Sequence, residues 1–156
     1  MAGSPVEATE GSRVLLPIEA PVERFSGFGP SRLAFGREPA MAEVDLAADD
    51  SGSRKLIRQH CPEGPGVYGM IDPEGRLIYV GKSKSLRARL VSYFTGGSED
   101  CKARRIVACS QRIVWEPAPH EFTALLRELE LIRRFCPRFN VRGRPGRGRR
   151  AYVGLG

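Results

Sequence analysis

The stretch from Gly66 to Tyr93 constrains the fold more than any other part of the chain. Two short runs, Val67–Ile71 and Arg76–Val80, are separated by an Asp-Pro-Glu-Gly tetrapeptide at residues 72–75. Proline sets φ near the start of a tight turn and glycine accepts a positive φ near its end. The pattern therefore predicts a β-hairpin, and a basic segment that reads as a helix follows it at once.

Strict alternation in the second strand predicts that Leu77 and Tyr79 point to one face and Ile78 and Val80 to the other. Ser83 or Ser85 is expected to cap the basic helix, which continues to about Phe94. Further elements are expected at residues 100–110 (helix), 112–116 (strand) and 121–135 (helix), the last stopped by Pro137.

These elements predict an α/β fold with a small three-stranded antiparallel sheet flanked by helices. Residues 56–141 are expected to form its single domain. Residues 1–55, rich in Pro, Gly, Ala, Ser and acidic residues, are expected to be a disordered or loosely docked extension. Residues 142–156 read as a basic Gly/Arg-rich tail with a short strand at residues 151–153.

The net charge of +7 is unevenly distributed along the 156 residues. Residues 1–50 hold 4 Lys/Arg and 9 Asp/Glu, whereas residues 51–156 hold 21 and 9. A positive field of this strength attracts polyanions such as nucleic acids. No apolar run reaches membrane-spanning length and no signal-peptide pattern is seen, so we expect a soluble, cytoplasmic protein. The four cysteines include no C-x-x-C pair, so no zinc motif is expected.

Glu128 is the acidic residue best suited to a metal ion. On a helix its neighbours three and four positions away are all apolar, namely Ala124, Leu125, Leu131 and Ile132. An ionised carboxylate in such surroundings needs a cation nearby. Mg²⁺ keeps several waters, so one protein carboxylate and a substrate phosphate suffice to hold it. Glu128 is therefore either a metal ligand or the partner of a nearby arginine.

The other acids of this helix are interpreted differently. Glu130 has Arg127, Arg133 and Arg134 as neighbours, which predicts a solvated, salt-bridged face and makes Glu130→Ala a harmless control. Glu121 is either a second ligand or an acid that favours the positive end of the helix dipole.

Two tyrosines and several cations lie close together in the hairpin and the basic helix. Tyr68 and Tyr79 are on adjacent strands, and Lys82 follows the second strand in a Gly-Lys-Ser loop. Arg87 and Arg89 both flank the apolar stripe of the helix, and either can offer a planar fork to a phosphate. A tyrosine that acts as a base needs its pKa lowered from about 10, which neighbouring cations would do.

These residues resemble the GIY-YIG endonuclease family, especially its UvrC-like nuclease domains and their stand-alone relatives of the Cho type. The resemblance covers about residues 64–153 and rests on several blocks in order: Gly66-Val67-Tyr68, the run from Tyr79 to Leu90, the run from Ala124 to Glu128, and Pro137 to Val141. Pro119-His120 departs from the usual polar cap, and Arg127 from a usual apolar residue, where it is read as adding a phosphate contact.

The resemblance implies roles for individual residues. It selects Arg89 over Arg87 as the family arginine and makes Glu128 the ligand of Mg²⁺ or Mn²⁺. Asn140 is expected to tether the active-site helix or to back the phosphate site, and Tyr93 to occupy a position near the substrate. The expected catalytic set is Tyr68, Tyr79, Lys82, Arg89 and Glu128, with Tyr68 or Tyr79 as the base; Arg87, Tyr93, Arg104, Arg105 and Asn140 are expected at DNA phosphates, and Gly66 and Gly81 in support.

The function so implied is metal-dependent cleavage of DNA in nucleotide excision repair, by a monomer that contacts the DNA backbone without reading sequence. A UvrB-like helicase is the loading partner that the resemblance suggests. Two alternatives stay open: a non-catalytic nucleic-acid-binding module, and a fragment of a longer repair protein.

Overall fold

Four antiparallel strands form one sheet in the order β1-β4-β2-β3. The structure, a computed structural model, describes residues 24–32, 40–96 and 99–140. The strands are β1 (Ala42–Asp45), β2 (Gly66–Ile71), β3 (Leu77–Ser83) and β4 (Arg112–Pro117). The helices are α1 (Asp50–His60), α2 (Leu86–Ser92), α3 (Cys101–Ala108) and α4 (Glu121–Phe135).

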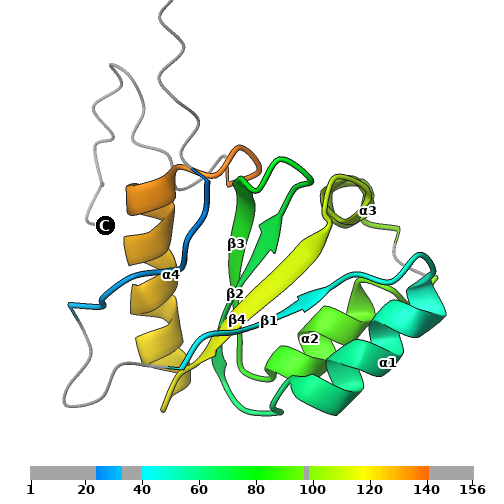
Figure 1. The fold of residues 1–156 in the computed structure, drawn as a ribbon. Coiled ribbons are helices and arrows are strands. Elements are labelled where there is room, and N and C mark those ends of the chain that lie inside the picture. Colours follow the sequence, from blue (N-terminus) through cyan, green and yellow to red (C-terminus); the bar gives the residue numbers. More distant parts are fainter. Residues whose placement is uncertain (1–23, 33–39, 97–98, 141–156) are drawn as a thin grey trace, which may run out of the picture.

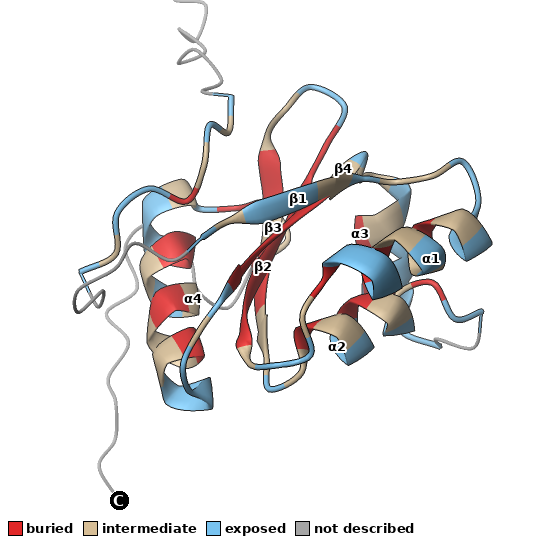
Figure 2. Ribbon diagram, turned by 60° about the horizontal axis from the view of Figure 1, so that its bottom comes forward, coloured by how far each residue is buried: buried red, intermediate tan, exposed pale blue. Residues whose placement is uncertain are grey.

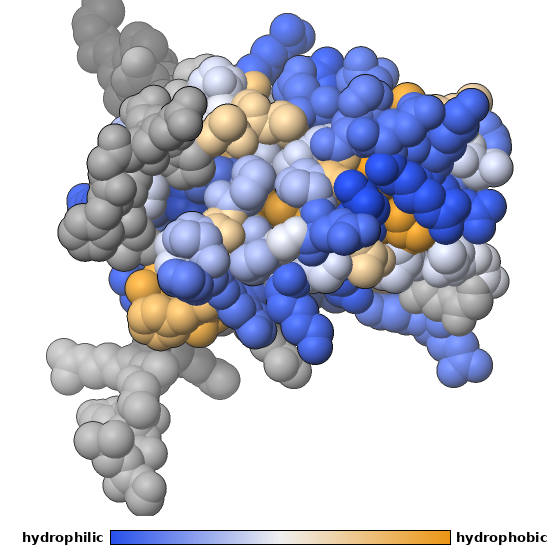
Figure 3. All heavy atoms as spheres, turned by 90° about the horizontal axis from the view of Figure 1, so that it is seen from below, coloured by the Kyte–Doolittle hydropathy of each residue, from blue (hydrophilic) through white to orange (hydrophobic). Residues whose placement is uncertain are grey.

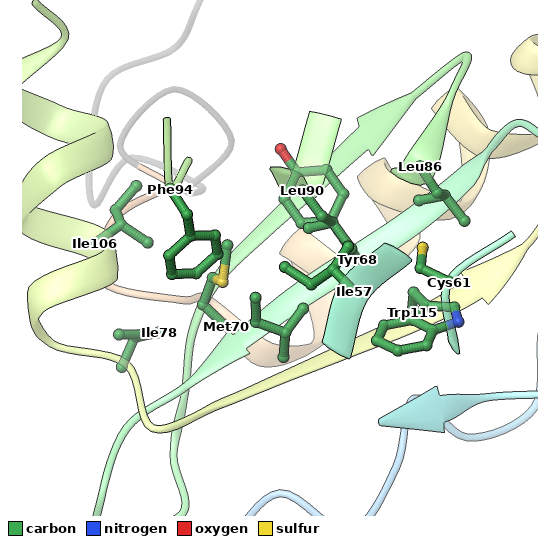
Figure 4. Close-up of a cluster of buried hydrophobic side chains, with 11 residues drawn as sticks. Ile57, Cys61, Tyr68, Met70, Ile78, Leu86, Leu90, Phe94, Ile106 and Trp115 are labelled. Carbon is green, nitrogen blue, oxygen red and sulfur yellow. The ribbon is translucent and has the colours of Figure 1, made fainter. Parts of the chain in front are cut away.

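Helices cover both faces of the sheet (Figure 1). α4 packs alone on one face, where Leu131 and Ile132 meet Val67, Val80 and Val114. α1, α2 and α3 cover the other face, with a cluster that includes Ile57, Leu90, Ile106 and Trp115 (Figure 4). The expected α/β class, an antiparallel sheet flanked by helices, is confirmed.

The sheet has one strand more than expected, and order begins before the predicted residue 56. β1 pairs with β4, with Val44 opposite Ile113, and α1 begins six residues before Leu56. The Asp49 carboxylate accepts a hydrogen bond from the Gly52 N–H at 3.1 Å and so caps α1. β1 is an exposed edge strand, mostly blue and tan in Figure 2 beside the red central strands.

The hairpin forms as predicted, but its alternation does not hold. Gly75 has φ 81° in the turn, as expected. The register shifts between Met70 and Ile71, which pair with Tyr79 and Leu77 respectively and leave Ile78 as an extra residue. As a result, Ile78 and Tyr79 pack in the cluster below α2, whereas Leu77 packs below α4. Tyr79 pairs with Met70, two residues beyond Tyr68, and so lies on the same face as Tyr68, whereas the bulge changes the faces of Ile78 and Leu77.

The remaining elements lie close to their predicted positions. α4 spans Glu121–Phe135 as expected, and His120 gives it no side-chain cap. α3 and β4 are within two residues of expectation, and α2 ends at Ser92 rather than at about Phe94. Residues 142–156, including the predicted strand at residues 151–153, lie outside the described residues.

Arg127 is buried, which corrects its reading as a phosphate contact. Its side chain is 3% exposed and forms a two-pronged ion pair with Glu116 of β4 at 2.9 and 3.1 Å. Its remaining N–H groups donate to Glu130 at 2.7 Å and to the carbonyl oxygens of Gly29 and Pro30. Arg127 thus fixes α4, β4 and the segment of residues 24–32 to one another.

Glu130 belongs to the same network, so the predicted salt bridge forms, with Arg127 at 2.7 Å, but the Glu130 side chain is only 24% exposed rather than fully solvated. Its carboxylate accepts hydrogen bonds from the Ser31 hydroxyl at 3.1 Å and the Arg32 N–H at 3.0 Å, besides that from Arg127. These bonds, with those from Arg127, hold the Pro30 end of residues 24–32 against α4. Glu130→Ala would disturb this contact and is therefore a poor control.

Across the described part of the chain, no helix is both long enough and apolar enough to cross a membrane.

Candidate active site

Three phenols and one guanidinium group meet on the face of the sheet below α2. The hydroxyls of Tyr68 and Tyr93 form a hydrogen bond at 2.9 Å. Arg89 donates from Nε to the Tyr68 oxygen at 3.2 Å and from Nη2 to the Tyr93 oxygen at 3.4 Å. The Tyr79 ring lies 6.1 Å from that of Tyr68. Figure 4 shows the Tyr68 ring within the core and its hydroxyl oxygen at the margin.

Burial dominates the electrostatics of these phenols. Desolvation raises the pKa of Tyr79 and of Tyr93 to about 12 each. The pKa of Tyr68, whose side chain is 1% exposed, is also raised by burial, and the positive charge of Arg89 offsets this only in part. Arg89 lowers each of these pKa values, as expected, but in the protein on its own burial outweighs its charge and the net shift is upward. At neutral pH all three phenols are protonated.

Both motif glycines permit close approaches that a side chain would block. A Cβ at Gly81 would lie 2.5 Å from the Tyr68 hydroxyl oxygen, because these two residues are cross-strand partners. A Cβ at Gly66 would lie 2.5 Å from the Glu116 carbonyl oxygen and 2.6 Å from Leu86. Gly81 therefore makes room for the phenol, and Gly66 lets β2 approach β4 and α2.

The outer edge of β3 is covered by the residues that follow α4. The Phe139 N–H donates to the Ile78 carbonyl at 3.0 Å. The Asn140 amide accepts from the Val80 N–H at 2.9 Å and donates to the Val80 carbonyl at 2.7 Å. Asn140 is buried, and both its amide oxygen and nitrogen are used in this way. Its geometry is that of a tether between the end of α4 and the strand that carries Tyr79.

Glu128 occupies the next position along the same edge. Alternate residues of an edge strand turn their backbone groups outward, and Lys82 follows Ile78 and Val80 in that series. Desolvation raises the pKa of Glu128, and the charge and the backbone N–H of Lys82 oppose the shift, which places Lys82 beside this carboxylate. The Lys82 ammonium group lies 3.7 Å from Glu121, which also brings that acid to this end of β3.

This arrangement fits a divalent cation held by a single protein carboxylate. Among the described residues no group of three or more Asp, Glu, His or Cys side chains could enclose a metal ion. Glu128 is half-buried and pays a desolvation cost that a cation would relieve. Mg²⁺ binds in this manner when waters and substrate phosphates complete its coordination.

The other predicted phosphate-binding residues are spread over two helices. Arg87 points away from the phenols and donates to the Cys61 carbonyl and to Glu63, at 2.7 Å each. Arg104 and Arg105 are exposed on α3, where Arg105 lies 5.9 Å from the Phe139 ring.

Lys102 was not anticipated from the sequence. Its Nζ lies 5.6 Å from the Tyr79 ring centroid, at the start of α3. The spacing of charges along α3 contained no signal for this contact, since it depends on the packing of α3 beside β3.

Seen from below, the end of the molecule where α4 begins is mainly hydrophilic, with small separate apolar patches (Figure 3).

Residues 64–141, half of the chain, match the family model of the UvrC-like GIY-YIG domain. The chain belongs to this family. The match begins just before β2 and ends just after Asn140, so it contains the phenols, Arg89, Glu128 and the tether but neither β1 nor α1.

Curated relatives of this UvrC-like domain are much longer proteins. UvrABC system protein C of Mycobacterium marinum is 46% identical over 84 residues, which are 53% of this chain and 13% of the relative. That of Rhodococcus jostii is 48% identical over 84 residues, 53% of this chain and 12% of the relative. That of Kocuria rhizophila is 42% identical over 93 residues, which are 59% of this chain and 14% of the relative. The chain thus spans about an eighth of each relative.

A solved structure is also similar to this chain. It is the GIY-YIG N-terminal endonuclease domain of UvrC from Thermotoga maritima, described as bound to its catalytic divalent cation, magnesium. The identity is 34%, the match covers 56% of this chain and 98% of that chain, and the TM-score is 0.49.

Proposed function

We propose that this UvrC-like GIY-YIG chain is a metal-dependent endonuclease that hydrolyses phosphodiester bonds in DNA. The observation that carries the proposal is the position of Glu128 at the outer edge of β3, beside the strand end whose other face holds Arg89 and the phenols. Because Glu128 lies at an edge, a phosphate drawn to it is within reach of groups from both faces. The curated relatives are named for the UvrABC system, so we place the cleavage in nucleotide excision repair, with a UvrB-like loading partner.

The proposed cofactor is Mg²⁺ or Mn²⁺ on Glu128. When bound there, such an ion supplies positive charge that stabilises anionic phosphate oxygens and lowers the pKa of nearby acids. Within this chain, Glu128 would hold the ion, beside the backbone N–H and the charge of Lys82.

Arg89 is proposed to stabilise the negative charge that develops on the phosphate. Its guanidinium group is oriented by two phenol oxygens and stacks on the Tyr93 ring, with 4.9 Å between Cζ and the ring centroid. A charged donor oriented before the reaction begins stabilises a transition state without reorganisation. Lys82 adds a second positive charge at the same end of β3.

Tyr68 is proposed as the acceptor of the proton of the attacking water, with Tyr79 as the alternative. Burial keeps both phenols protonated in the free protein, so either becomes a base only once substrate and cation add positive charge beside it. Tyr79 is more exposed than Tyr68, whereas Tyr68 has the direct bond to Arg89.

The test is cleavage of labelled nicked, branched and damaged duplexes with Mg²⁺, by the wild-type chain and its Glu128→Gln and Arg89→Ala variants. We expect each variant to cut at least about a hundredfold more slowly, because each loses a group that acts on the charge of the transition state. Binding of the same duplexes in EDTA should change far less for Glu128→Gln.

The matched control is Glu63→Gln, which removes an exposed carboxylate that pairs with Arg87 away from the phenols. It should cut as fast as the wild type. Wild-type rates for Glu128→Gln or for Arg89→Ala would contradict the proposal, and DNA binding without any cleavage would favour a non-catalytic module.

A further inference from the structure

A second feature of the molecule is a basic cavity of about 420 Å³ at the turn end of the β2–β3 hairpin. We call it the arginine pocket. Its walls come from the segment of residues 24–27, from the hairpin and from the end of α4, and they include Arg24, Phe25, Arg76, Arg134, Phe135 and Arg138. The Phe25 N–H donates to the Gly75 carbonyl at 2.8 Å and holds the first segment against the turn.

The charge of the arginine pocket suits an anion. Four arginines line it, and no acidic side chain does so in the described part of the chain. Arg76 is paired with Asp72 at 2.8 Å, and Arg134 donates to the Phe28 carbonyl at 3.1 Å. Arg24 and Arg138 are exposed and, among the described residues, form no salt bridge. Arg138 stacks on the Phe139 ring at 5.2 Å, and its charge helps to lower the pKa of Asp72, but neither contact uses a carboxylate salt bridge. These two arginines are therefore the ones that a ligand phosphate can pair with.

The arginine pocket also has an apolar part. The rings of Phe25 and Phe135 lie 5.6 Å apart between centroids, and Leu77 and Ile78 extend the same wall. A cavity of this volume is within the usual range for small-molecule sites. Guanidinium groups bind phosphate oxygens in a planar fork, and aromatic faces stack on nucleobases. The combination matches one nucleotide unit, with its phosphate on the arginines and its base on the apolar wall.

The arginine pocket lies on the same two elements as the candidate active site. Ile78 precedes Lys82 by four residues of β3, about 13 Å at strand rise. Phe135 follows Glu128 by seven residues of α4, about 10 Å at helix rise. A strand bound at both places would therefore span only a few nucleotides between them.

We propose that the arginine pocket binds a nucleotide of the same DNA strand, a few steps from the phosphate at Glu128. This inference rests on the proposed function for the identity of the strand, but not for the existence of the site. Arg24 lies outside residues 64–141, whereas Arg138 lies inside them. One of the two arginines that can pair with a phosphate is therefore outside the region that matches the family model. The pocket would fix how far along the strand the cleaved bond lies.

The test measures binding of a short labelled single strand to the full chain in EDTA, by fluorescence anisotropy at several salt concentrations. Arg24→Gln/Arg138→Gln should bind about tenfold more weakly at low salt. Its slope of log K against log salt should be shallower by about 0.7 for each phosphate that the variant no longer binds. The control is Lys55→Gln/Arg58→Gln, which removes the same charge from exposed positions on α1.

A second variant guards against a folding defect. Ser26→Glu places a carboxylate among the four guanidinium groups, so it should preserve the melting temperature and still weaken strand binding. Equal affinities and slopes for the pocket and α1 variants would overturn the proposal. The proposal would also be overturned if free dAMP bound as tightly as the labelled strand, because the pocket would then be a site for a small nucleotide. If pocket variants lose binding but the wild type cuts nothing, the pocket stands and the proposed function fails.

Discussion

At the scale of single residues, Tyr68 shows how burial and charge compete. Its hydroxyl accepts a hydrogen bond from Arg89, which favours the ionised form, yet its ring is enclosed by the core, which disfavours it. The effect of burial is larger than that of Arg89, so the pKa of Tyr68 is raised, and the same holds for the pKa values of Tyr79 and Tyr93. The phenols therefore act as neutral groups that orient Arg89 until a substrate changes their surroundings.

We expect a loss of stability at alkaline pH from these phenols. A phenol with a raised pKa binds its proton more tightly in the folded than in the unfolded state. Its contribution is complete below pH about 10 and is lost as the pH rises towards about 12, since the unfolded chain releases the proton first. Urea unfolding at pH 8, 10 and 11 should show the decline.

Tyr93→Phe provides the comparison. It removes one of the raised phenols and leaves the ring, so its unfolding free energy should fall less steeply over the same pH range. Identical slopes for the variant and the wild type would show that the phenol cluster is not the cause.

At the scale of elements, α4 is held by two different kinds of contact. Leu131 and Ile132 bury an apolar stripe against the sheet. Arg127 forms an ion pair with β4, and the side chains of Arg127 and Glu130 hold residues 24–32 through hydrogen bonds. The apolar stripe fixes which face of α4 meets the sheet. Because Glu128 is next to Arg127, the ionic network also helps to fix the height and rotation at which Glu128 reaches Lys82.

Loss of Arg127 should be costly because it leaves Glu116 buried without a partner. Removal of one member of a buried ion pair typically costs about 3–5 kcal/mol, so Arg127→Met should lower the free energy of unfolding by that order. Replacing both partners, as in Arg127→Met/Glu116→Met, should recover much of the loss, since no uncompensated charge then remains. Urea titrations of the three proteins measure this, and a double variant no more stable than the single one would contradict it.

The difference between predicted and observed elements has a physical basis. α4 was predictable because its apolar period, its flanking breaker Pro137 and its length are all local in sequence. β1 was not, because a four-residue exposed strand has no apolar period and forms only through pairing with β4, some 70 residues further on. Arg127 looked like a surface arginine because Glu116 and Gly29 are distant in sequence.

At the scale of the whole molecule, the folded unit is larger than the region that matches the UvrC-like family. β1 completes the sheet on one side, and residues 24–32 lie against α4 on the other (Figure 1). Phe28, 2% exposed, belongs to the core below α4. The acidic N-terminal part of the chain therefore contributes to the core as well as to the charge balance.

Removal of residues 1–39 should lower the free energy of unfolding by about 3–5 kcal/mol, the usual cost of losing a buried phenylalanine. It also removes the partners of Arg127 at Gly29 and Pro30. Removal of residues 1–23 alone keeps each of these contacts and is the control. Equal urea midpoints for the two truncated chains would show that residues 24–32 do not stabilise the fold.

The candidate site was predictable to the extent that its residues are close in sequence or on one helix face. Arg89 lies beside Tyr68, within the set that the family resemblance implied, and Glu128 was singled out from its apolar helix neighbours as either a metal ligand or an arginine partner. Asn140 could not be resolved from sequence between a tether and a phosphate contact, because that depends on which strand it meets. The arginine pocket needs three distant segments and has no local pattern at all.

The cross-strand pairing of Tyr68 with Gly81 links the two tyrosine-glycine strings of the hairpin. The phenol of one string fills the space that a side chain in the other would need. A side chain at position 81 therefore requires a smaller residue at position 68 first, whereas a smaller residue at position 68 leaves the glycine unaffected. The constraint thus runs from the phenol to the glycine, across thirteen positions of chain.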